Sequence, residues 1–172
     1  VDLSDGFWRL IVTPEQKYNF CYVMPDPPGS RVRIVVPSAL QMGWAESPAC
    51  FCAATETGRD IIELLLRDKI DLPEHPFEQF MTPSEAPKTA PPGAEPCTSI
   101  GVFVDDCVLA VVENDDRTLL RRASRATLHA IHSMFPPPEV SGHAGGKDPT
   151  SRKKLEKGDA RFNVEKEILG FL

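Results

Sequence analysis

One stretch near the middle of the chain limits the possible folds more than any other: residues 99–112, with the sequence SIGVFVDDCVLAVV. Two valine-rich apolar runs flank the adjacent carboxylates Asp105 and Asp106, and short runs of this composition are typical of β-strands. An Asp-Asp pair suits a tight turn, although by itself it is also typical of a solvated loop. Because the flanking runs are too apolar to lie on a surface, we expect a buried hairpin with both carboxylates at its tip.

The chain before this hairpin predicts three shorter strands. Residues 7–12 follow an acidic opening and alternate in the manner of a strand. Residues 18–24 and 31–36 predict two more strands, separated by a turn with three prolines and a glycine. We therefore expect an antiparallel meander over residues 7–36.

Two long helices and a closing strand complete the pattern. The first helix should run over residues 48–69, because Ser47 is a suitable N-cap and Pro48 suits the first helical position. The second should run over residues 115–135, where two acids are followed by apolar residues at helical spacing. Residues 165–172 predict a last strand.

Two segments lack such patterns. Residues 70–98 contain seven prolines and few large apolar side chains, which predicts a flexible insertion. Residues 136–160 are rich in Gly and Lys and predict a loop. The sequence GHAGGK within this loop fails as a phosphate-binding motif, because its glycine spacing is wrong, Asp148 replaces Ser or Thr, and no strand precedes it.

The order of elements predicts an α+β fold, in which one antiparallel, ferredoxin-like sheet carries two helices on one face. A length of 172 residues fits one domain, and 41% apolar residues suffice for a core. No apolar run is long enough to cross a bilayer, so we expect no membrane partner. A dense motif begins directly at Val1, so we expect N-terminal elements to precede it.

Charge and cysteine content narrow the class of protein. The net charge of −6 argues against a protein that merely coats nucleic acid. It leaves room for an enzyme that holds nucleic acid through metal ions and local basic stretches, such as residues 117–125 and 147–157. Five cysteines without paired spacing, and no Asn-x-Ser/Thr site, favour a reducing intracellular setting.

The carboxylates permit a particular chemistry. Asp2 and the Asp105-Asp106 pair each lie beside a predicted strand, and they would converge if those strands are neighbours. Close carboxylates repel unless a cation compensates, and Mg²⁺ takes oxygen ligands. Two ions about 3.5–4 Å apart can activate a hydroxyl and stabilise a leaving phosphate oxygen. The pattern permits phosphoryl or nucleotidyl transfer without separating a polymerase, a nuclease and an inert metal site. His129 and His132 could bind zinc, but no third ligand is suitably spaced.

Four motifs resemble the palm of the reverse transcriptases of gypsy-type LTR retrotransposons, in the family's order and over nearly the whole chain. They are DLSDGFWRLIV (2–12), QMGWAESP (41–48), FVDD (103–106) and EILGF (167–171). The third resembles the Tyr-x-Asp-Asp hairpin, and the last resembles the strand that leads to the thumb. The resemblance implies a right-hand polymerase palm with incomplete fingers and without a thumb.

The resemblance also implies roles for individual residues. Asp2 and Asp105 would be catalytic ligands of two Mg²⁺ ions, or of Mn²⁺, together with the carbonyl of Leu3, and Asp106 would be a supporting acid. The remaining implied site residues are Phe7 as a steric gate, Met42 and Gly43 at the nucleotide, Lys154 or Lys157 as the proton donor to pyrophosphate, and Phe103 near the primer end.

The implied reaction is RNA-directed DNA polymerisation, in which a primer 3′-hydroxyl attacks the α-phosphate of a dNTP on an RNA or DNA template. The implied partners are the remaining fingers, the thumb and the RNase H region of a polyprotein. The chain departs from the family at Phe103, where Tyr is usual, and at Trp44 and Glu46 in the second motif. Two alternatives stay open: an inactive, truncated relic of a mobile element, and a metal-dependent nuclease or phosphatase that uses the same acids.

Overall fold

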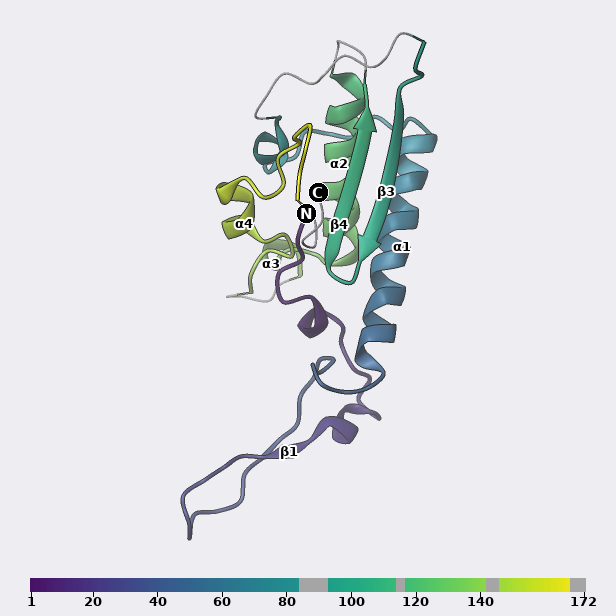
Figure 1. Ribbon diagram of the computed structural model, residues 1–172. Helices are drawn as coiled ribbons and strands as arrows, with labels where there is room; N and C mark the ends of the chain where they lie inside the picture. Colours follow the sequence, from purple (N-terminus) through teal and green to yellow (C-terminus); the bar gives the residue numbers. More distant parts are fainter. Residues whose placement is uncertain (84–92, 114–116, 142–145, 168–172) are drawn as a thin grey trace.

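The computed structural model describes residues 1–83, 93–113, 117–141 and 146–167. Helices and short antiparallel strands are mixed in this part of the chain (Figure 1), so the fold is of the α+β class. None of the described helices combines the length and the apolar character needed to cross a membrane.

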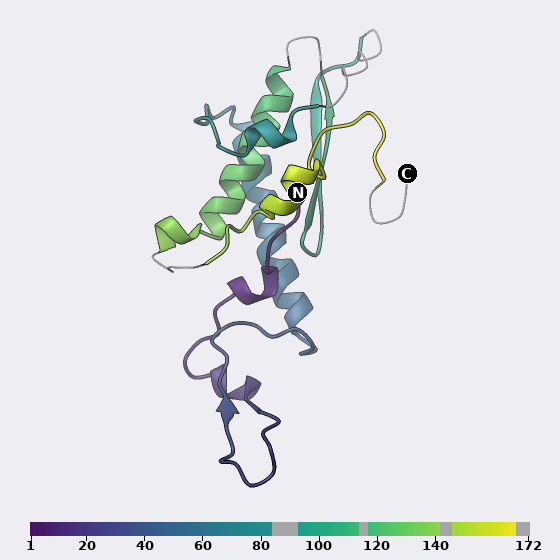
Figure 2. The same ribbon diagram turned by 90° about the vertical axis from the view of Figure 1, so that its left-hand side faces the viewer.

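The centre of the molecule is an antiparallel hairpin of β3 (Cys97–Phe103) and β4 (Asp106–Val112). Two long helices, α1 (Ser47–Arg67) and α2 (Thr118–Met134), pack on the same face of this hairpin, which Figure 2 shows edge-on. The predicted hairpin and both predicted helices are therefore confirmed, with helix ends that differ by three residues at most. The hairpin is not buried as expected: alternate residues of β3 are exposed and only Cys107 of β4 is buried, because the helices cover one face.

The turn of the hairpin consists of Val104 and Asp105, since Phe103 pairs directly with Asp106. Val104 has a left-handed backbone, with φ at 55°, which β-branched residues rarely adopt. Its side chain packs against a buried cluster, which fixes the turn in this conformation. This cluster consists of Leu3, Phe51, Ile131 and Phe135.

The two helices begin differently from the prediction. Ser47 is the first residue of α1, and its hydroxyl donates to the carbonyl of Gln41 at 2.6 Å instead of capping the helix. The two acids expected to begin the second helix lie outside the described residues. Glu113 supplies the cap of α2, because its carboxylate accepts the backbone N–H groups of Leu119 at 2.7 Å and Leu120 at 2.9 Å.

The predicted strand over residues 7–12 is wrong. Gly6–Arg9 form a short 3-10 helix, η1, whose Phe7 ring stacks on Phe51 with 4.6 Å between the ring centroids. Gly6 lies against the same ring, where an added Cβ would be 2.5 Å from it. Beyond η1 the segment pairs through a single antiparallel bridge, between Ile11 and Ala39, so its alternating pattern reflects mainly packing on α1 and not a full strand.

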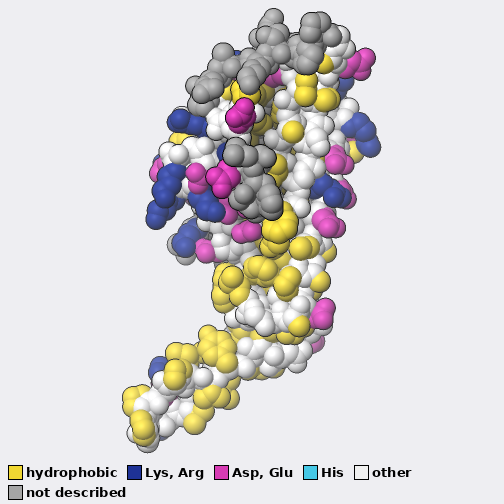
Figure 3. Space-filling model, in the orientation of Figure 1, with side chains coloured by type: hydrophobic (Ala, Val, Ile, Leu, Met, Phe, Trp, Pro, Cys, Tyr) yellow, Lys and Arg dark blue, Asp and Glu magenta, His cyan; other side chains and the backbone are white. Residues whose placement is uncertain are grey.

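The other two strands of the expected meander are present in shortened form, as β1 (Tyr22–Val23) and β2 (Ile34–Val35). They lie on an arm that extends away from the hairpin (Figure 1), and its visible surface is largely apolar (Figure 3). The described residues thus form two separate two-stranded sheets in place of the single ferredoxin-like sheet that we expected. The predicted closing strand is not formed at residues 165–167, and residues 168–172 lie outside the described part.

Parts of both segments expected to be irregular are folded. The described part of the proline-rich segment contains a 3-10 helix, η3 (Glu78–Met81), whose Met81 is fully buried. The Gly- and Lys-rich segment contains two short helices, α3 (Pro138–Ser141) and α4 (Arg152–Lys157). Apolar side chains explain both departures, because Met81 and Leu155 are buried against the rest of the molecule.

Candidate metal centre

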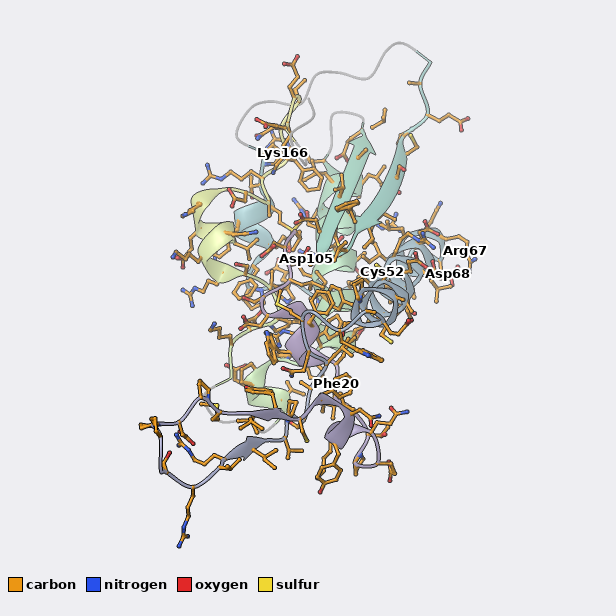
Figure 4. The ribbon with its side chains drawn as sticks, turned by 60° about the horizontal axis from the view of Figure 1, so that its bottom comes forward. Phe20, Cys52, Arg67, Asp68, Asp105 and Lys166 are labelled. Atoms are coloured by element: carbon orange, nitrogen blue, oxygen red, sulfur yellow. The ribbon has the colours of Figure 1, made fainter. Side chains whose placement is uncertain are left out.

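The first three residues of the chain pair with the tip of the hairpin. The N–H of Leu3 donates to the carbonyl of Asp105 at 3.2 Å, and the N–H of Cys107 donates to the carbonyl of Val1 at 2.9 Å. Asp2 is therefore directly opposite Asp106 in an antiparallel bridge. In this type of pair the two side chains lie on one face of the sheet and close together. The backbone thus brings together acids that are about a hundred positions apart in the sequence (Figure 4 labels Asp105).

The electrostatics of Asp106 reflect this arrangement. Burial raises the pKa of the Asp106 carboxyl, and the neighbouring carboxylates of Asp105 and Asp2 raise it further. The amino group of Val1 and the ammonium of Lys154 act in the opposite direction. Their effect is smaller, so the site has excess negative charge, which favours a bound cation.

Lys154 is the basic residue that the structure places against these acids. Its Nζ lies 2.7 Å from Oδ1 of Asp2, and this hydrogen bond raises the pKa of the Lys154 ammonium. The sequence left Lys154 and Lys157 as equal candidates, and the structure brings Lys154 to the site while Lys157 is exposed at the end of α4.

Backbone pairing fixes the position of α4 relative to Asp2. The N–H of Ser151 donates to the carbonyl of Asp2 at 3.1 Å, and the N–H of Ser4 donates to the carbonyl of Pro149 at 2.7 Å. Thr150 lies opposite Leu3 in a second antiparallel bridge. The residues that precede α4 thus form a strand-like edge beside the acids, which the sequence did not predict because one residue pair leaves no alternating pattern.

Arg9 and Asp5 are further site residues whose positions the sequence did not predict. The guanidinium of Arg9 donates to three backbone carbonyls, at 2.6 Å to Ser4, 2.9 Å to Lys147 and 2.8 Å to Asp148. Burial lowers the pKa of Arg9. Asp5 accepts from the ammonium of Lys147 at 3.1 Å. Arg9 therefore joins the N-terminal segment to the segment before α4.

The other residues to which the resemblance gives a role lie outside the acidic cluster. Phe7 is half-buried against Phe51. Met42 is exposed in the loop before α1, beside Gly43, whose φ is 92°. Phe103 is 57% exposed at the end of β3, opposite Asp106. The structure thus brings Asp2, Asp106 and Lys154 into one cluster, with Asp105 joined to it through Leu3.

The donor set of this cluster fits a hard cation. Its ligands would be carboxylate and carbonyl oxygens, which Mg²⁺ and Mn²⁺ prefer. In the described part of the chain, no three His, Cys, Asp or Glu side chains are already gathered as ligands of one ion. A cation at Asp2 would compete with the ammonium of Lys154 for the same carboxylate.

The description of this site rests on the residues of this chain alone. No family model, no curated protein and no solved structure matches the chain.

Proposed function

We propose that this chain is the palm of a reverse transcriptase from a retrotransposon polyprotein, which catalyses nucleotidyl transfer to a primer 3′-hydroxyl. The observation that supports this most directly is the bridge between Asp2 and Asp106. It joins the first and third of the four motifs through the backbone.

In the proposed reaction, Asp2, Asp105 and the carbonyl of Leu3 would hold Mg²⁺, with Mn²⁺ as a possible substitute. The ions would neutralise the charge that develops on the attacking and leaving oxygens. Lys154 is protonated at neutral pH, since its pKa is raised. It therefore carries the proton that the departing pyrophosphate would take up, and the pairing with Asp2 makes it a weaker acid until Asp2 lets go of it. Asp106, which lies opposite Asp2 and directly after Asp105, would support the other two acids.

The proposed substrates are dNTPs on a primed RNA or DNA template. Phe7 would exclude a 2′-hydroxyl, Met42 and Gly43 would contact the nucleotide and template base, and Phe103 would lie at the primer end. The proposed partners are the remaining fingers, the thumb and the RNase H region of the polyprotein. A reducing intracellular compartment is the setting in which we expect this assembly.

Metal binding tests the proposal on the chain as it stands. Titration with Mn²⁺, followed by the relaxation of water protons, should show binding that is weakened at least about tenfold by D2N or D105N, because each change removes a charged ligand. D60N is the matched control, since Asp60 is exposed on α1 next to Arg59, and it should leave binding unchanged. Equal binding in all four proteins would refute the proposed site.

Primer extension then separates the proposed function from its alternatives. Incorporation of dNTPs that requires Asp2 and Asp105 supports the polymerase. Metal binding without incorporation favours an inactive relic of a mobile element. Hydrolysis of nucleic acid or of phosphate esters without dNTPs, abolished by D2N, would instead assign the same acids to a nuclease or phosphatase.

A further inference from the structure

Three histidines and an aspartate meet on the face of α2 that is remote from α1. Nε2 of His75 lies 3.1 Å from Nδ1 of His132, and Nε2 of His132 lies 3.1 Å from Oδ1 of Asp148. His129 packs edge-on against His75, with 5.1 Å between the ring centroids. His75 and Asp148 lie on segments that the sequence predicted to be irregular, so spacing alone could not join them to the pair on α2.

A backbone group fixes the direction of these hydrogen bonds. The N–H of Phe77 donates to Nδ1 of His75 at 3.1 Å, so this nitrogen must be the acceptor. In the neutral ring the proton is then on Nε2, which donates to Nδ1 of His132. The proton of His132 is in turn on Nε2, which donates to the carboxylate of Asp148. When His75 and His132 are both neutral and both carry the proton on Nε2, all three hydrogen bonds have one donor and one acceptor.

The donor-to-acceptor direction of these hydrogen bonds also argues against a metal ion between the rings of His75 and His132. A ligating nitrogen must offer a lone pair. Nε2 of His75 carries a proton for as long as Phe77 donates to the other nitrogen. The group is therefore a chain of hydrogen bonds and not a preformed zinc site.

This chain fastens one segment to α2. We name residues 72–81 the latch segment; it includes His75, Phe77 and η3. His129 also contacts it, by donating from Nε2 to the carbonyl of Pro73 at 2.9 Å. At its end, Met81 is only 1% exposed. Release of the segment would therefore uncover Met81.

Arg125 makes further contacts between α2 and the latch segment. Its guanidinium pairs with Glu78 at 2.8 Å and donates to the carbonyl of Leu72 at 3.1 Å. These contacts do not involve an imidazole. They hold the segment on α2 at any pH at which Glu78 is ionised. Protonation of a histidine must therefore overcome these contacts before the segment is released.

A proton added to either ring breaks the hydrogen-bond chain. A charged imidazole donates from both nitrogens, so charged His75 would direct a proton at the N–H of Phe77, and charged His132 would direct one at Nε2–H of His75. Burial lowers the pKa of His75 to about 4, with smaller contributions in the same direction from His132 and His129. Asp148 and Glu78 oppose the shift.

The sign of the pH dependence follows from this shift. The ordinary pKa of 6.5 applies to the released segment, and the pKa of about 4 applies to the packed one. Packing is therefore complete above pH 6.5 and weakens as the pH falls through the interval between these two values, where only the released form takes up the proton.

We propose that His75, His132 and Asp148 form a proton-operated latch, which holds the latch segment on α2 at neutral pH and releases it in mildly acidic solution. The latch does not depend on the proposed nucleotidyl transfer. Asp148 also accepts the N–H of Thr150 at 2.8 Å, and Thr150 lies opposite Leu3. The latch therefore ends beside the strand-like edge of the candidate metal centre.

Methyl NMR of methionine tests the latch on the full chain. The methyl signal of Met81 should move reversibly from a packed toward a solvent-exposed position as the pH falls from 7.5 to 4.5, with the change beginning below about pH 6.5. Met24 and Met42, on the distant arm and loop, are internal controls that should not move. In the same protein at pH 7.5, ¹⁵N shifts should place the proton on Nε2 in both His75 and His132.

Two variants separate the latch from general acid unfolding. H75Q retains a donor and an acceptor but cannot be protonated, so Met81 should stay packed at pH 5. H129Q retains a donor to Pro73 and leaves the chain of three intact, so Met81 should still be released. A Met81 signal that does not respond in the unchanged protein, an H75Q protein that responds equally, or a proton on Nδ1 of either ring would overturn the proposal. The tautomer measurement decides the question even where H75Q does not fold.

Discussion

The ammonium of Lys154 and a bound divalent cation would compete for the same carboxylate, that of Asp2. In the structure Lys154 holds Oδ1 of Asp2 at 2.7 Å, and its own side chain is 51% exposed. The Asp2 side chain is 15% exposed, but an ion pair whose lysine is half in water is still screened and contributes little to stability. The pair is therefore weak enough for an incoming cation to open, after which the ammonium would be free to meet a phosphate.

This competition predicts the effect of K154M. Loss of the ammonium should strengthen Mn²⁺ binding by about two- to fivefold, which corresponds to the weak coupling of an exposed pair. If nucleotidyl transfer is present, the same change should lower its rate by about 100-fold or more, because the proton donor is lost. Titration by proton relaxation and primer extension measure the two effects.

The matched control for this change is K153M, the adjacent exposed lysine of α4. It should leave both quantities close to those of the unchanged protein. Weaker Mn²⁺ binding in K154M would contradict the proposed competition, since it would mean that the lysine helps to assemble the site for the ion.

Among the elements, α2 depends on a cap supplied by Glu113, the residue directly after β4. Glu113 is only 8% exposed and receives two N–H groups from the first turn of the helix. E113A should lower the free energy of unfolding by about 1–2 kcal/mol, because these donors lose their partner. E113Q keeps one carbonyl acceptor and should cost about half as much.

Urea unfolding followed by circular dichroism measures these costs. E139A is the control, since Glu139 is an exposed acid on α3, and it should change the free energy of unfolding by less than about 0.5 kcal/mol. Equal costs in E113A and E139A would show that Glu113 does not cap the helix.

The 3-10 helix η1 depends on a close approach between Gly6 and Phe51. G6A should destabilise the protein by about 1–3 kcal/mol, because an added methyl group would lie 2.5 Å from a ring that is fully buried. G101A provides the comparison: Gly101 in β3 has open space around its position, and alanine there should be neutral or slightly stabilising. Thermal unfolding midpoints of the two variants check this difference, and a stable G6A protein would contradict the packing of η1.

These elements also show why some of the structure could be predicted from the sequence. The hairpin and both helices depend on local periodicity, which a sequence displays directly. Residues 7–12 also alternate, but contact with Phe51 decides their conformation, and this residue is some forty positions away. His75 and Asp148 join the pair on α2 only through tertiary packing. The choice between Lys154 and Lys157 depended on the register of α4, which the bridge between Leu3 and Thr150 determines.

At the scale of the whole molecule, the described residues form a packed body and an apolar arm. The body contains β3, β4, α1 and α2, with both buried clusters. The arm contains the two-residue strands β1 and β2, and much of its apolar surface is exposed (Figure 3). Its most exposed apolar residues include Tyr22, Val23, Val32 and Ile34. A two-stranded sheet of this length is at best marginally stable in water, so the arm should open independently of the body.

Amide hydrogen exchange tests this difference in stability. Amides of residues 22–35 should exchange at least about 100-fold faster than those of residues 123–131 on α2, because opening of the arm exposes no buried cluster. The β3–β4 hairpin is the matched comparison for the arm: it has the same antiparallel pairing over seven residues in each strand and should exchange slowly at its centre. Equal protection in the arm and in α2 would mean that the two unfold as one cooperative unit. In that case the short sheet would owe its stability to the body, and the division of the molecule into body and arm would be incorrect.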